Sequence, residues 1–90
     1  MPAVTPKRYL VKIVPSAQRD LDDLDPTVLA RLAPDLQVLE THPRPRGCLK
    51  LTAEEGYRLR AGSYRILCRI DDDSRTVFIY RVKHRRDVYR

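Results

Sequence analysis

The strongest constraint on the fold is a set of three β-forming segments in the C-terminal half, joined by connections too short to hold a helix. Residues 57–60, 63–70 and 76–82 are rich in tyrosine, valine, isoleucine and leucine. The stretches between them, 61–62 and 71–75, are of turn length, and the glycine in the first suits a tight hairpin. Strands with such short connections pair antiparallel. The sequence therefore predicts a hairpin meander.

The upstream half is expected to add one strand and two helices. Residues 7–14 alternate in polarity like a strand, and Pro15 should end it. Ser16 can cap a helix over residues 17–24. Leucines recur at helical spacing over residues 26–41, which predicts a second helix.

Pro34 should kink or split that second helix, because proline removes a backbone donor and crowds the preceding turn. Residues 42–47 form a loop and residues 48–52 a short strand. The predicted class is α+β: an N-terminal strand and an αα-hairpin packed on a mainly antiparallel, twisted sheet (β-α-α-β-β-β-β), with a short helical tail. Ninety residues make a single domain, residues 1–90.

Charge is distributed unevenly along the chain. Residues 1–56 hold eight Lys/Arg and eight Asp/Glu, whereas residues 57–90 hold ten Lys/Arg and four Asp, so the last third carries the whole excess of +6. Such concentration favours a nucleic acid or an acidic peptide as partner. A basic face that is merely solvated is the alternative.

Strand alternation predicts where the basic side chains lie. Residues at i and i+2 share a face of a sheet, so Arg58, Arg60 and Arg65 should lie together on the face away from the helices. The guanidinium group is a planar fork that can grip phosphate, and the last third of the chain has few acids to pair with it. The face turned toward the helices should carry Tyr64, Ile66, Cys68 and Ile70.

No metal site or cofactor site is expected. Cys48 and Cys68 lie far apart, no histidines have ligand spacing, and the acidic triple at residues 71–73 lacks a full set of oxygen ligands, so it should be a solvated turn. Cys68 should be a small core residue. No signal peptide or membrane-spanning run is apparent, which predicts a cytoplasmic protein without a membrane partner.

The segments GSYRILCRIDD (62–72), TVFI (76–79) and VKHRRDVYR (82–90) resemble the RelE/ParE toxin superfamily, on the RelE side. The resemblance implies the toxin of a type II toxin–antitoxin pair. RelE-like members enter the ribosomal A site and cleave the bound mRNA without a metal. The implied partners are a RelB-like antitoxin, the ribosome and mRNA, with operator DNA bound only by the toxin–antitoxin complex.

The resemblance matches Arg58, Arg60, Arg65, Arg85 and Tyr89 to the basic and tyrosine positions of the family, and the basic character of the last third adds the other candidates. The candidate catalytic residues are Arg60, Arg65, His84, Arg85 and Tyr89. The candidate RNA contacts are Lys50, Arg58, Arg81, Lys83, Arg86 and Arg90. Arg60 and Arg65 would stabilise the reacting phosphate, and Arg85 would lie near the leaving oxygen. Tyr89 would orient or deprotonate a ribose 2′-hydroxyl and stack on a base.

The proton acceptor stays open at this point. Some family members have lysines where this chain has Arg58 and Arg60, and arginine is a poor general base. His84 is an alternative base, or else a strand-end histidine hydrogen-bonded to the backbone. Two other functions are possible on the same fold: a ParE-like inhibitor of DNA gyrase, and a non-catalytic module that binds RNA or the ribosome. The set Arg65, Arg85 and Tyr89 favours RNA cleavage.

Overall fold

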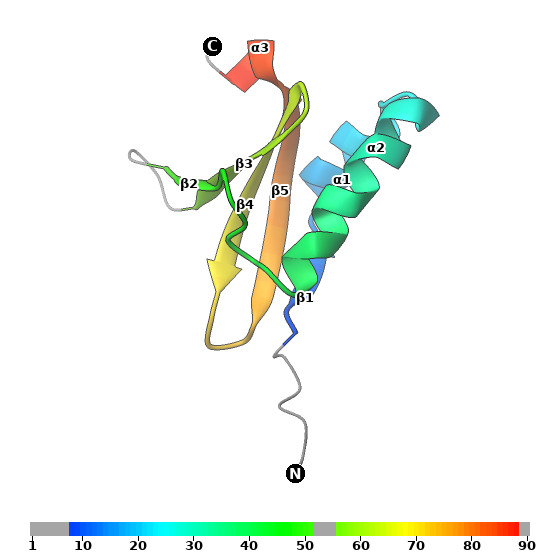
Figure 1. Ribbon diagram of the computed structural model, residues 1–90. Coiled ribbons are helices and arrows are strands. Elements are labelled where there is room, and N and C mark those ends of the chain that lie inside the picture. Colours follow the sequence, from blue (N-terminus) through cyan, green and yellow to red (C-terminus); the bar gives the residue numbers. More distant parts are fainter. Residues whose placement is uncertain (1–7, 52–55, 89–90) are drawn as a thin grey trace.

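A computed structural model describes residues 8–51 and 56–88 of the chain. Two helices cover one face of a five-stranded sheet, and the other face is left open (Figure 1). The elements in chain order are β1 (Leu10–Ile13), α1 (Pro15–Asp22), α2 (Pro26–Gln37), the 3-10 helix η1 (Val38–Glu40), β2 (Leu49–Lys50), β3 (Tyr57–Ala61), β4 (Tyr64–Asp71), β5 (Thr76–His84) and α3 (Arg85–Val88).

The sheet has the strand order β1-β5-β4-β3-β2. Strands β2 to β5 form the expected antiparallel meander, and β1 pairs with β5 in parallel, from Leu10 opposite Thr76 to Ile13 opposite Ile79. The parallel pair is possible because the helical hairpin follows β1 and carries the chain across the sheet to β2 at the far edge. The predicted α+β class is confirmed.

The start of α1 differs from the prediction. The helix begins at Pro15, whose fixed φ and missing N–H suit a first helical position, so Ser16 lies inside the helix and does not cap it. The Ser16 hydroxyl instead donates a hydrogen bond to the carbonyl oxygen of Tyr80 in β5, at 2.7 Å. Asp25 holds the N-cap position of α2 without a side-chain hydrogen bond to the backbone.

Pro34 does not split α2, which continues to Gln37 before η1 tightens the last turn. Of the two expected effects of Pro34, the split is therefore wrong, and the kink stays a prediction. Proline removes the N–H that would bond to the carbonyl of Ala30, and both residues are exposed, so water can take the place of the lost donor.

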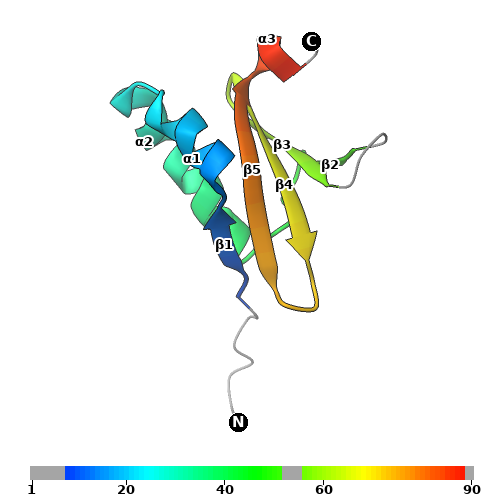
Figure 2. The ribbon, with the colours of Figure 1, turned by 180° about the vertical axis from the view of Figure 1, so that it is seen from behind.

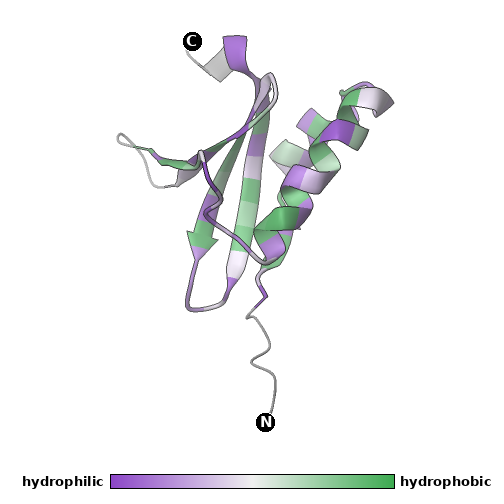
Figure 3. Ribbon diagram, viewed as in Figure 1, coloured by the Kyte–Doolittle hydropathy of each residue, from purple (hydrophilic) through white to green (hydrophobic). Residues whose placement is uncertain are grey.

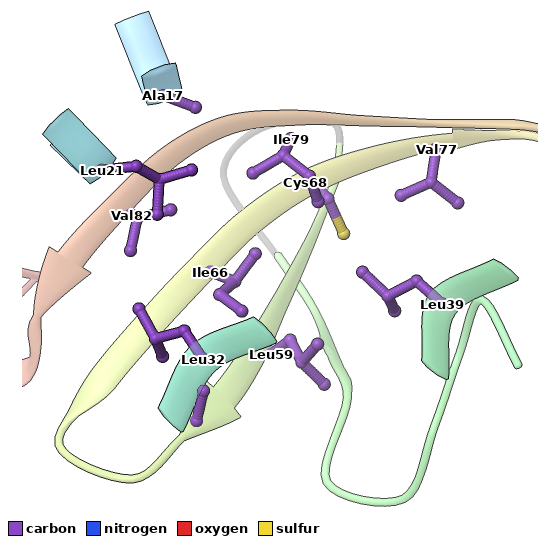
Figure 4. Packing of buried hydrophobic residues seen from close by; sticks show 11 residues of the cluster. Ala17, Leu21, Leu32, Leu39, Leu59, Ile66, Cys68, Val77, Ile79 and Val82 are labelled. Carbon is purple, nitrogen blue, oxygen red and sulfur yellow. The ribbon is translucent and has the colours of Figure 1, made fainter. Parts of the chain in front are cut away.

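The core lies between the helices and the sheet (Figure 4). Its largest fully buried side chains are Leu39, Val77, Ile66, Ile79 and Cys68. Ala17 and Leu21 of α1 and Leu32 of α2 cover them from the helical side. Cys68 is thus the small core residue that alternation predicted, and Tyr64 and Ile70 pack against the same cluster.

A bulge in β5 shifts which residues face the core. Leu67 pairs with Arg81 but Cys68 pairs with Ile79, which leaves Tyr80 as an extra residue. Val77 and Ile79 are therefore buried before the bulge, and Val82 is buried after it. The switch from odd to even positions explains why both faces of this strand look apolar in the sequence.

Helix α1 also covers the edge of β5 beyond the end of β1. The backbone N–H of Val82 donates to a carboxylate oxygen of Asp20 at 2.8 Å, one helical turn after Ser16 binds the carbonyl of Tyr80. Seen from behind, α1 lies along β5 (Figure 2). Side chains of α1 thus bind the Tyr80 carbonyl and the Val82 N–H. These two backbone groups are therefore not available for pairing with another strand.

Candidate functional site

Three basic side chains form one row across the sheet. Arg60 of β3 lies directly opposite Arg65 of β4, and Arg65 lies opposite Lys83 of β5. Their chain neighbours Leu59, Ile66 and Val82 are buried in the core, so the three side chains belong to the open face. We call Arg60, Arg65 and Lys83 the basic row.

Arg65, at the centre of the basic row, is only 8% exposed. Its Nη1 donates to the carbonyl oxygens of Tyr64, at 3.2 Å, and Gly62, at 3.5 Å. Gly62 has a φ of 61°, the left-handed conformation that a tight turn requires. The β3–β4 turn therefore holds one end of this guanidinium in place, and the group still has Nη2 and Nε as further donors.

Arg60 and Lys83 flank this fixed arginine. Arg60 is exposed and Lys83 half-buried, and neither forms a salt bridge with a residue that the structure describes. Like charges in neighbouring positions repel one another unless an anion lies between them. The arrangement favours binding of a phosphate group across β3, β4 and β5.

Arg81 is held by α1. Its guanidinium Nε lies 2.8 Å from Oδ2 of Asp20, and its NH2 group donates to Oδ1 at 3.3 Å. Burial disfavours the charged carboxylate of Asp20, but the hydrogen bonds from Arg81 and from the Val82 N–H outweigh burial and lower its pKa. The expected contact of Arg81 with RNA stays a prediction, and its charge is balanced by a carboxylate that the sequence patterns did not single out.

The chain after β5 is tied to the same turn as Arg65. The backbone N–H of Arg85 donates to the carbonyl of Ser63 at 2.7 Å. The side chains of Arg85 and Arg86 are exposed. Figure 3 shows hydrophilic residues at the start of α3, next to this end of the sheet. The turn thus places the start of α3 near one end of the basic row.

His84 has a defined hydrogen-bond role. Its Nδ1 accepts the backbone N–H of Arg86 at 3.3 Å, and its ring meets the Tyr64 ring edge-on, with centroids 5.3 Å apart. A neutral imidazole that accepts at Nδ1 carries its proton on Nε2. In this arrangement the free nitrogen of His84 is a donor. This contact matches the alternative of a strand-end histidine hydrogen-bonded to the backbone, and the role as general base stays a prediction.

The remaining expected contacts are more dispersed. Lys50 pairs with Tyr57 at the sheet edge and so alternates onto the other face from Arg58. Arg58 lies in the next row of the open face, opposite Leu67. Tyr89 and Arg90 lie outside the described residues.

The open face also has a hollow at some distance from the basic row. It measures about 730 Å³ and is lined by Arg69, Phe78, Tyr80 and the acidic turn at residues 71–73, among others. In that turn Asp72 accepts two hydrogen bonds from Arg44, at 2.9 and 3.1 Å, and one from the Tyr9 hydroxyl at 2.6 Å. The turn therefore connects segments that are far apart in the sequence. Arg69 is the one cation among the described residues that line the hollow, whereas the basic row has three.

The described residues offer little for metal or thiol chemistry. No group of three or more His, Cys, Asp or Glu side chains comes together among them. Burial, with a smaller effect of Cys48, raises the pKa of Cys68 to about 12, so this thiol stays protonated at neutral pH. In the same part of the chain no helix is long and apolar enough to cross a bilayer.

The chain is a small α+β domain with a helical hairpin on one face of its sheet and a basic row on the other. Comparisons with known proteins show the family to which the chain belongs. The sequence model described as "ParE toxin of type II toxin-antitoxin system, parDE" matches residues 11–89. The chain belongs to the RelE/ParE superfamily of type II toxins.

Similar proteins carry RelE-type names. Toxin RelG of Mycobacterium tuberculosis is 39% identical over 84 residues, covering 91% of this chain and 97% of that protein. A chain of the M. tuberculosis toxin–antitoxin complex RelBE2 superposes with a TM-score of 0.77 at 38% identity, covering 86% of this chain and 98% of that one. A chain of the archaeal RelE–RelB complex of Pyrococcus horikoshii gives 0.74 at 27% identity, covering 87% and 96%.

Proposed function

We propose that this toxin is a metal-independent endoribonuclease that enters the ribosomal A site and cleaves the bound mRNA, which stops translation. The observation that carries the proposal is the basic row, in which a fixed arginine lies between an exposed arginine and a lysine. Membership of the superfamily and the RelE-type names of the similar proteins support it.

The proposed reaction is an in-line attack within the RNA. The ribose 2′-oxygen forms a bond to the adjacent phosphorus, and the bond from phosphorus to the 5′-oxygen of the next nucleotide breaks. The 2′-hydroxyl loses its proton and the leaving 5′-oxygen gains one. The products are a 2′,3′-cyclic phosphate and a free 5′-hydroxyl. The phosphate carries additional negative charge in the transition state, where fixed donors help most.

The basic row would supply those donors. Arg65 offers a guanidinium that the turn has already oriented, so little reorganisation is needed during the reaction. Arg60 and Lys83 would complete the cradle from the neighbouring strands. Arg85, at the start of α3, would lie near the leaving oxygen, and Tyr89 would orient or deprotonate the 2′-hydroxyl.

Acid–base groups are weak in this arrangement. The Nδ1 of His84 already accepts the backbone N–H of Arg86, and arginine is a poor base. Most of the rate enhancement should therefore come from positioning and charge stabilisation, with the ribosome holding the mRNA in line for attack. This would make cleavage dependent on the ribosome.

The proposed partners follow from the proposed function as an RNA-cleaving toxin. A RelB-like antitoxin with an acidic or amphipathic segment would cover the basic surface, as antitoxins accompany the toxins in the similar complexes. Operator DNA would be bound by the toxin–antitoxin complex and not by the toxin alone. The site of action would be the cytoplasm, where ribosomes and mRNA are found.

A purified translation system tests the function directly. The toxin is added to ribosomes stalled on a defined mRNA, and primer extension maps new 5′ ends. We expect cuts in the A-site codon, a 2′,3′-cyclic phosphate on the upstream fragment and no cleavage of the same RNA without ribosomes. Salt-sensitive binding without any cut would instead indicate a non-catalytic module.

Inhibition of DNA gyrase is the second candidate, because the matching family model is described as a ParE toxin. Gyrase poisoning would be a protein-binding function on the same fold. A supercoiling assay with purified gyrase separates the two. Loss of supercoiling together with intact mRNA in the translation system would decide for gyrase.

A further inference from the structure

A groove between the edge of β5 and the end of α1 lies next to Lys83, at one end of the basic row. It encloses about 400 Å³ and is lined by Asp20, Asp23, Leu24, Tyr64, Arg81, Val82, Lys83 and His84. We call it the edge groove. It opens between the end of α1 and the C-terminal half of β5, where β1 no longer covers that strand. Lys83 belongs both to this groove and to the basic row.

The edge groove is lined by apolar side chains and by two kinds of polar group, namely hydrogen-bond donors and carboxylate acceptors. Tyr64 and Leu24 are half-buried and supply the apolar surface. His84 directs its Nδ1 to the backbone of Arg86, so its Nε2–H is left as a donor. The carboxylate of Asp23 is exposed and makes no hydrogen bond or ion pair with any residue that the structure describes.

The other acid of the groove is already engaged. Asp20 accepts from Arg81 and from the Val82 N–H, so both charges of that pair are balanced within the wall. Among the acids of the groove, Asp23 alone is left to accept from a ligand, and Lys83 and His84 are left as donors. The groove therefore suits a flat, polar-edged ring attached to an anion.

We propose that the edge groove is a nucleobase site. It would receive the base of an RNA nucleotide whose phosphate lies at the Lys83 end of the basic row, so that the nucleotide reaches round the edge of β5 and Lys83 contacts both parts. This proposal rests on the proposed RNA-cleaving function. A nucleobase offers an apolar face to Tyr64 and Leu24, and an edge of donors and acceptors to Asp23 and His84.

Asp23 should determine which nucleobase the edge groove prefers. A carboxylate accepts hydrogen bonds, so it favours a base that presents an exocyclic amine. Uracil has carbonyl oxygens on both sides of its single ring N–H, and these would face the carboxylate lone pairs. The edge groove should therefore prefer cytosine over uracil, two bases of nearly equal size that differ in an amine and a carbonyl.

The binding experiment uses 3′-CMP and 3′-UMP with the full-length toxin. We expect 3′-CMP to shift the NMR signals of the Tyr64 and His84 rings, with an affinity about tenfold above that of 3′-UMP. Asp23→Asn, which replaces one acceptor oxygen with a donor amide, should remove that difference. The matched control is Asp22→Asn, one residue earlier and outside the groove, which should keep it.

The outcomes separate this proposal from the cleavage activity. Absence of shifts at Tyr64 and His84, or equal affinities for both nucleotides in the parent toxin, would overturn the nucleobase site whether or not the toxin cuts RNA. A preference that survives Asp23→Asn would also overturn it. Selective 3′-CMP binding by a toxin that leaves mRNA intact would support the site and count against the nuclease.

The cleavage map gives a second readout. In the translation system, the base distribution at the cut sites should change with Asp23→Asn and stay unchanged with Asp22→Asn. Uracil at the position read by the groove should become more frequent by several-fold. An identical distribution in all three proteins would contradict the assignment of the groove.

Discussion

At the scale of single residues, Asp20 joins the helical layer to the sheet. One carboxylate accepts the backbone N–H of Val82 and two hydrogen bonds from Arg81, at 2.8 to 3.3 Å. Its side chain is 18% exposed, whereas that of Arg81 is 41% exposed. The backbone N–H of Val82 at the sheet edge and the guanidinium of Arg81 thus both bind one acid of α1.

Asp20→Asn should therefore lower the free energy of unfolding by about 2 kcal/mol, in the range measured for hydrogen bonds to charged groups. Urea unfolding at neutral pH measures this. Asp22→Asn is the control, because Asp22 is exposed and its side chain accepts, among the described residues, a hydrogen bond only from Gln18 of the same helix. Equal stabilities of the two variants would contradict the role given to Asp20.

The same carboxylate predicts a pH dependence. Despite partial burial, the bonds from Arg81 and Val82 hold the pKa of Asp20 below its ordinary value. Its contribution is therefore complete above the unfolded-state pKa of about 3.9 and is lost as the pH falls through the folded-state pKa. The stability gap between the parent and Asp20→Asn should be constant above about pH 5 and shrink in more acidic solution. A gap that widens on acidification would refute this.

At the scale of elements, the β3–β4–β5 meander was predictable and the bulge in β5 was not. Alternation in β3 and β4 correctly placed Leu59, Ile66 and Cys68 toward the helices. The extra residue at Tyr80 could not be read from the sequence, because apolar residues occupy both parities of β5. For the same reason Lys83 could not be assigned to the row of Arg60 and Arg65 in advance.

Contacts between residues far apart in the chain could not be predicted from the sequence either. Ser16 looks like a helix cap, and only the tertiary structure shows that its hydroxyl reaches β5. Asp72 looks like part of a solvated turn, yet it binds Arg44 and Tyr9. Local pattern determines which element a residue joins, whereas such partners depend on how the elements pack.

Gly56, just before β3, gives a sharp test of the packing. It has a φ of 131°, and a Cβ there would lie 2.8 Å from the carbonyl oxygen of Cys68. Gly56→Ala should cost about 3 kcal/mol through the clash and the strained backbone. Gly47 also has a positive φ but open space around it, so Gly47→Ala should cost only about 1 kcal/mol. Thermal unfolding compares them, and equal costs would argue against this packing at Gly56.

At the scale of the whole molecule, the chain has a neutral N-terminal half and a C-terminal third that carries the net charge of +6. The helical hairpin covers one face of the sheet, and the basic row lies on the other. A superfamily toxin with this layout should harm the cell when it acts alone.

We therefore expect expression of the chain by itself to arrest growth, and co-expression of its antitoxin to restore growth. The antitoxin gene is expected next to the toxin gene, and its product should carry acidic or amphipathic segments that cover the basic surface. Colony counts after induction measure both effects. Unimpaired growth in a host with compatible ribosomes would weigh heavily against the toxin function.

The basic row is proposed to stabilise the reacting phosphate. Arg65 is unsuitable for the first test because it is buried and bonded to the β3–β4 turn, so its truncation would also disturb folding. Arg60→Ala and Lys83→Ala flank it and remove one charge each. Arg31→Ala removes the same charge from an exposed position of α2.

The deciding measurement is the single-turnover rate of A-site mRNA cleavage for these three variants and the parent toxin. Arg60→Ala and Lys83→Ala should each slow cleavage by about 10- to 100-fold with unchanged folding, and Arg31→Ala should cleave at the parent's rate. Parent-like rates for both row variants, or an equal loss in all three, would contradict the assignment of the phosphate site to the basic row.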